Sequence, residues 1–69
     1  MQIGEIRVGG RYGKESGNGE AIVRTVTARG LEPTGYRWVK YEEEGEKHKG
    51  REGRIPVSRF AKWAQFEVK

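Results

Sequence analysis

Hydrophobic and polar positions alternate most clearly over residues 20–29, a stretch that is dense in β-branched side chains. On an extended chain Ile22 and Val26 share one face of this stretch, and the other face carries Val23, Thr25 and Thr27. A period of two residues is typical of a β-strand, and β-branched side chains favour that conformation. The pattern therefore predicts a strand over residues 20–29.

A second strand is predicted over residues 36–41, after a turn in residues 30–35. Tyr36 and Trp38 share one face of this strand with Lys40, and the opposite face carries Arg37, Val39 and Tyr41. Because aromatic side chains occupy both faces, we expect one face to be partly exposed or covered by another element.

A long polar stretch, residues 42–53, then leads to a short third strand over residues 54–57. Pro56 cannot donate a hydrogen bond to a neighbouring strand, so this strand is expected to lie at a sheet edge or to end there. Acidic residues of the polar stretch precede basic ones, and the two halves can pair across a hairpin or remain a solvated, mobile loop.

A short helix is predicted over residues 59–65, with Ser58 as its N-terminal cap. Phe60, Trp63 and Ala64 follow the spacing i, i+3, i+4 and so line one side of this helix. That spacing favours core positions for the two aromatic side chains. The chain can return as a final strand over residues 66–68.

Eleven glycines divide the chain into short pieces. Gly9-Gly10 marks a turn, and the segment from Gly13 to Gly19 is predicted to be a polar loop. Short strands, tight turns and one late helical turn together predict a single all-β domain over residues 1–69. The expected architecture is a small antiparallel barrel of about five short strands with one short C-terminal helical turn.

Two resemblances carry this prediction further. The order Gly53, Ile55, Pro56 and later Phe60 resembles the Gly-x-Ile-Pro-x-x-aromatic ending of SH3 domains, with one extra residue before the aromatic. The acidic loop and paired tryptophans of peptide-binding SH3 domains are missing, so the resemblance implies an SH3-like barrel and not proline-peptide binding. The layout, closing in Phe-x-Lys-Trp-Ala over residues 60–64, also resembles short, mostly uncharacterised proteins of phages and other mobile elements.

Composition narrows the classes of partner and compartment. Fourteen Lys and Arg against ten Glu, with no Asp, leave a net charge of +4, which favours polyanions as partners. There is no cysteine, no long apolar run and no secretory signal at the N-terminus. We therefore expect a cytoplasmic protein without a membrane-spanning segment.

The sequence offers few candidate catalytic residues. His48 is the single histidine, and neither it nor Ser16 or Ser58 has an evident partner nearby. Without Cys, Asp or a second His, only glutamates are left to hold a metal, and no cofactor is expected. An enzyme is a remote alternative, because Pro33-Thr34-Gly35-Tyr36 is similar to a hairpin of the tetrameric type II dihydrofolate reductase. The segment that lines the pore of that enzyme has no match here.

Basic residues next to aromatic ones are the features that favour nucleic acid. The expected mechanism is sequence-nonspecific docking on backbone phosphates, with an aromatic ring stacking on a base. The candidate nucleic-acid-binding residues are Arg37, Lys47, Lys49, Arg51, Arg54, Tyr36 and Trp38. A core position for Trp38 is the competing interpretation, because so small a barrel needs its large side chains inside.

The alternative function is a protein-binding module, such as a phage-encoded modulator or inhibitor of a host system. Small size, the likeness to mobile-element proteins and the mixed charges of the polar stretch support that alternative. Both interpretations describe a binding module that is not an enzyme.

Overall fold

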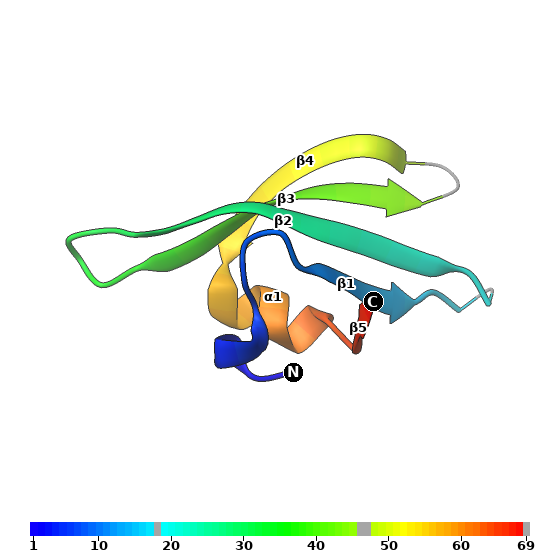
Figure 1. Cartoon of the computed structure of the whole chain (residues 1–69), viewed down its shortest axis with the longest axis horizontal. Helices are drawn as coiled ribbons and strands as arrows, with labels where there is room; N and C mark the ends of the chain where they lie inside the picture. The colour runs from blue at the N-terminus through cyan, green and yellow to red at the C-terminus, as the bar shows by residue number, and fades with distance from the viewer. Residues whose placement is uncertain (18, 46–47, 69) are drawn as a thin grey trace.

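A computed structural model describes residues 1–17, 19–45 and 48–68, with the side chains of residues 48 and 49 excluded. Its elements are listed in chain order: η1 (Ile3–Glu5), β1 (Arg11–Glu15), β2 (Ala21–Leu31), β3 (Arg37–Gly45), β4 (His48–Pro56), α1 (Val57–Trp63) and β5 (Phe66–Val68). Within this described part, the five strands form one open antiparallel sheet in the order β4-β3-β2-β1-β5 (Figure 1). The predicted all-β, antiparallel fold with one late helix is confirmed.

The strands are longer than predicted where the sequence is polar or rich in glycine. Residues 42–45 continue β3, and β4 begins at His48, so most of the expected polar stretch is paired sheet. Gly13 lies within β1 rather than in a loop. Cross-strand pairing explains these differences, because a neighbouring strand satisfies the backbone whatever the local propensity.

The β2–β3 hairpin begins its turn later than predicted. Strand β2 continues through Gly30 to Leu31, and the amide of Glu32 then donates to the carbonyl of Tyr36 at 2.8 Å. Gly35 has a φ of +90°, a conformation that side chains with a Cβ rarely adopt. The turn therefore spans residues 32–36.

Helix α1 packs against one face of the sheet and closes the core (Figure 1). The predicted cap at Ser58 is wrong, because the helix already begins at Val57, with Pro56 before it and no side-chain cap. Burial of Val57 fixes this first turn by packing instead. The buried hydrophobic residues are Ile6, Tyr12, Val26, Val39, Tyr41, Val57, Phe60, Ala61 and Ala64.

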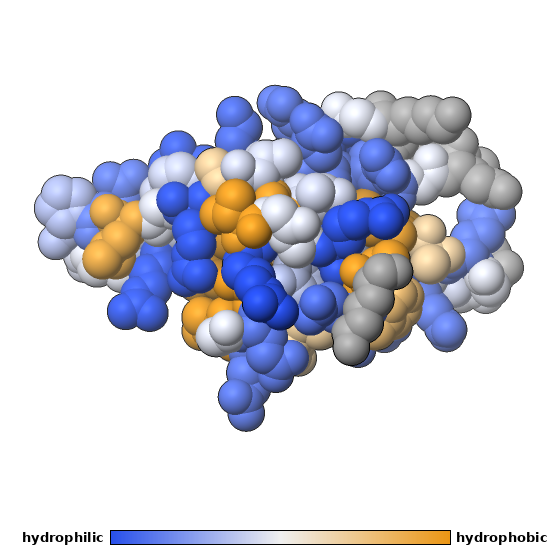
Figure 2. Space-filling model, in the orientation of Figure 1, coloured by the Kyte–Doolittle hydropathy of each residue, from blue (hydrophilic) through white to orange (hydrophobic). Residues whose placement is uncertain are grey.

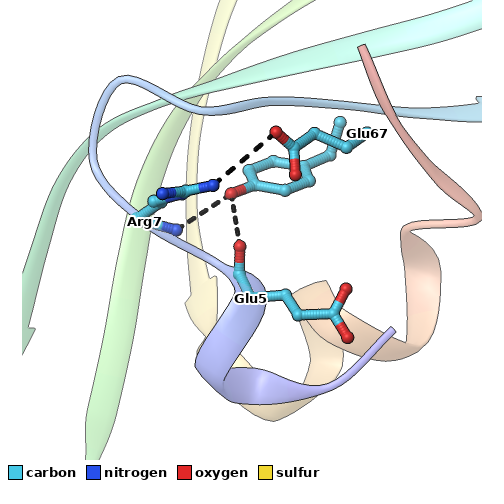
Figure 3. Close-up of polar contacts among 4 residues, drawn as sticks. Glu5, Arg7 and Glu67 are labelled. Atoms are coloured by element: carbon cyan, nitrogen blue, oxygen red, sulfur yellow. Dashed lines mark hydrogen bonds and ion pairs between the residues drawn. The ribbon is translucent and has the colours of Figure 1, made fainter. Parts of the chain in front are cut away.

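The fully buried Tyr12 fastens the N-terminal segment to the sheet (Figure 3). Its hydroxyl donates to the carbonyl oxygen of Glu5 at 2.7 Å and accepts from the amide of Arg7 at 3.0 Å. The Arg7 guanidinium also lies 3.9 Å from the carboxylate of Glu67 in β5. One side chain thus satisfies two backbone groups that regular structure leaves unpaired.

No helix among the described residues is long and apolar enough to cross a membrane.

Candidate functional site

The two faces of the sheet have different roles, and the cross-strand pairs assign residues to them. Val26, Val39 and Tyr41 point towards α1, so we call their side the helix face. Side chains alternate along a strand, and directly paired residues share a face. Trp38 and Lys40 therefore lie on the opposite side, which we call the open face.

A register shift between Val26 and Ala28 decides which residues join Trp38 on the open face. Ala28 pairs with Lys40, and Gly30 pairs with Trp38, so Thr27 is the extra residue of a β-bulge. Because of this bulge, Arg29 lies on the helix face, where its Nη1 donates to the carbonyl oxygen of Ile6 at 3.0 Å.

Trp38 and Arg54 form a cation–π contact on the open face. The guanidinium of Arg54 lies over the indole ring, 4.4 Å from the ring centroid, and 3.5 Å from the carboxylate of Glu32. The ring itself covers Gly30, where an added Cβ would lie 2.2 Å from Cζ2 of Trp38. A partly buried Trp38 thus supports Arg54, and Glu32 orients the same guanidinium.

The structure brings together only part of the predicted site. Trp38 and Arg54 lie on the open face and Tyr36 lies in the adjoining turn, whereas Arg37 pairs with Leu31 and Arg51 pairs with Glu43, both on the helix-face side. Lys47 and the side chain of Lys49 lie outside the described residues. Two cations that belong spatially with the site, Arg29 and Lys40, were not among the candidates. The alternation of side chains along β3 is enough to place Lys40 on the same face as Trp38. The bulge that positions Arg29 has no signal in the sequence.

Cations and carboxylates gather at opposite ends of the open sheet. We call residues 29–40, the distal part of the β2–β3 hairpin, the ribbon. The ribbon and the adjacent Arg54 hold four cations and one carboxylate: Arg29, Arg37, Lys40 and Arg54 against Glu32. The other end of the open face holds three exposed carboxylates, those of Glu42, Glu44 and Glu52. Four minus one leaves a charge of +3 at the ribbon end, so an anion is attracted to that end of the molecule.

The most buried ion pair is structural. The guanidinium of Arg24 on the helix face donates to Glu43 at 2.8 Å, and both side chains are less than a fifth exposed. Its carbon Cζ also lies 4.3 Å from the ring centroid of Tyr41 and 4.2 Å from that of Trp63. Because each neighbour of Arg24 belongs to the packed core, this cation is not available to a ligand.

The surface has hollows, but they lie away from the basic ribbon. One of about 530 Å³ is lined by Val23, Glu44, Gly45 and Gly50, at the end of β3 opposite the ribbon. Another of about 350 Å³ is lined by the backbone turn at residues 7–11 and by Glu67 and Val68. In the described part of the chain, His and Glu form no group of three that could hold a metal ion. The ribbon cations line neither of these two hollows, so we describe the candidate site as a charged surface.

Exposed apolar side chains also lie at the ribbon end of the molecule. The tip of the ribbon carries Leu31, whose side chain is 65% exposed, and Tyr36, which is 39% exposed. Figure 2 shows apolar atoms flanked by hydrophilic residues at that end of the molecule. Exposed apolar side chains therefore lie among the cations at this end of the molecule.

Comparison of the chain with family models, with curated proteins and with solved structures finds no match.

Proposed function

We propose that this protein is a non-catalytic module that binds nucleic acid through the ribbon and the adjacent part of β4. The observation that carries the proposal is the gathering of Arg29, Arg37, Lys40 and Arg54 at one end of the fold, with Glu32 as the one carboxylate among them. Phosphate contacts supply most of the affinity of nonspecific nucleic-acid binding, and they need cations placed in this way.

The side chain of Arg54 is held in place before a ligand binds. The Trp38 ring beneath it holds the guanidinium in place, so less side-chain entropy is lost when a phosphate binds. The Arg54 side chain is still 54% exposed and can reach a ligand. Tyr36 is the aromatic ring of the site most exposed to a ligand, because Trp38 is partly buried under Arg54.

The fold we propose for this function is an SH3-like barrel. The sheet order β4-β3-β2-β1-β5 supports it, as does the position of α1 between β4 and β5 in the chain. The segment Gly53 to Pro56, which leads directly into the helix, supports it too. In this proposal β1 joins the β4-β3-β2 part of the sheet to β5, because it pairs with both β2 and β5.

Fluorescence anisotropy with labelled oligonucleotides, measured over a range of salt concentrations, tests the function. We expect micromolar or tighter binding whose logarithm falls linearly with the logarithm of salt concentration. Lys40→Glu should weaken binding, while Lys14→Glu, the same charge change on β1, serves as the matched control. No binding at low salt, or equal loss in both variants, would contradict the proposed surface.

A protein-binding module, such as an inhibitor of a host system, is the second candidate, and the exposure of Leu31 favours it. A photo-crosslinking residue placed at position 31 should then capture one stoichiometric protein from nuclease-treated host lysate. Capture that requires intact nucleic acid would argue against this second function.

A further inference from the structure

The ribbon carries cations on both of its faces. Lys40 and the neighbouring Arg54 lie on the open face, whereas Arg29 and Arg37 lie on the helix face. A flat docking surface would need cations on one side only. Cations on both sides fit a ligand that presents phosphates to each side of the ribbon at once.

The ribbon also extends beyond the elements that cover the rest of the sheet. Strand β4 ends opposite Trp38 at Pro56, and α1 lies under the middle of the sheet (Figure 1). Residues 31–37 therefore form a free two-stranded hairpin, in a molecule that measures 40 Å along its long axis and 22 by 20 Å across. At about 3.3 Å per residue, the three residues in each arm of this hairpin, 31–33 and 35–37, give a projection of at most roughly 10 Å.

These dimensions match one kind of groove. A pair of strands about 4.8 Å apart, with its side chains, fits the major groove of B-form DNA, which is about 12 Å wide and about 8.5 Å deep. Each wall of that groove is a phosphate backbone, so both faces of an inserted ribbon meet phosphates. The minor groove of B-form DNA, about 6 Å wide, is too narrow without deformation.

Resting on the proposed nucleic-acid binding, we infer that the preferred ligand is double-stranded DNA and that the ribbon enters its major groove. Arg37 contacts the phosphates of one wall, and Lys40 and Arg54 contact those of the other. The turn at residues 32–36, which projects beyond the Leu31–Arg37 pair, meets the floor of the groove. Double-stranded RNA is a poorer ligand, because its major groove is deep and narrow.

The test compares three labelled probes of one sequence: a 20-base-pair DNA duplex, one of its single strands and the matching RNA duplex. Anisotropy titrations would use the wild-type protein, Arg37→Glu and Lys40→Glu, with Lys14→Glu as the matched control and circular dichroism to verify folding. Each phosphate contact multiplies the binding constant by about (1/[salt])^0.9, where [salt] is the molar salt concentration. At 0.1 M salt this factor is about eightfold.

We expect the DNA duplex to bind at least about tenfold more tightly than the other two probes. Arg37→Glu and Lys40→Glu should each lower duplex affinity by about eightfold or more and reduce the salt slope by about one contact. Equal or tighter binding of single-stranded DNA or duplex RNA would overturn groove entry while leaving nucleic-acid binding intact. Wild-type affinity in Arg37→Glu would overturn it as well, whereas failure to bind any probe would refute the proposed function itself.

Discussion

Replacing Gly30 by alanine tests whether the open-face site is built as described. The new Cβ would lie 2.2 Å from Cζ2 and 2.4 Å from Cε2 of Trp38, well inside van der Waals contact. Trp38 is partly buried and faces solvent on one side, so its ring can swing away. Arg54, which lies over that ring, then loses its support.

The free-energy change can be worked out from these contacts. Exposing on the order of 100 Å² of the indole costs about 2.5 kcal/mol at about 25 cal/mol/Å². Loss of an exposed cation–π contact adds about 0.5–1 kcal/mol. Replacing a glycine within a strand returns about 0.5–1 kcal/mol. Gly30→Ala should therefore lower the free energy of unfolding by about 2–3 kcal/mol, out of roughly 3–10 kcal/mol for a chain of this length.

Urea unfolding followed by far-ultraviolet circular dichroism measures this loss. With a slope of about 1 kcal/mol/M, the midpoint should fall by about 2–3 M. Gly17→Ala is the matched control, because an added Cβ there meets no atom within 4 Å. An unchanged midpoint in Gly30→Ala, with unchanged tryptophan emission, would refute the packing of Trp38 on Gly30 and the role assigned to it.

Three further changes test other parts of the structure. Glu32→Gln removes the carboxylate that competes with a phosphate for Arg54, so nucleic-acid affinity should rise about two- to tenfold in anisotropy titrations; a loss of affinity would contradict this role. Tyr12→Phe leaves two backbone groups without their partner and should cost about 1–3 kcal/mol in urea unfolding, with faster hydrogen exchange near residue 7; no change would rule out that anchoring. Gly53→Ala places a Cβ 2.4 Å from the hydroxyl of the buried Tyr41. This overpacking should lower the free energy of unfolding by about 1–3 kcal/mol in the same assay. Unaltered stability would contradict the close packing of Tyr41 on Gly53.

Local patterns determined the elements of this protein. Alternation over residues 20–29 identifies β2, the spacing of Phe60 and Trp63 identifies the buried side of α1, and Pro56 marks the end of β4. These features are readable because the period of a strand or helix, and the missing donor of proline, act within a few residues. The all-β class and the row of Tyr36, Trp38 and Lys40 on one side of β3 follow from the same rules.

The tertiary structure alone decided which charges meet. The bulge at Thr27 moves Arg29 to the helix face, and the pairing of β3 with β4 brings Arg54 over Trp38 and towards Glu32. No local signal encodes either event, because a bulge shifts every later residue of the strand to the other face, and strand pairing joins residues far apart in sequence. The sequence by itself thus determined the strands, the helix and a basic, aromatic-rich composition. Only the folded sheet added Arg54 to the cations of residues 29–40 and assigned these cations to its two faces, since both depend on the bulge and on which strands lie side by side.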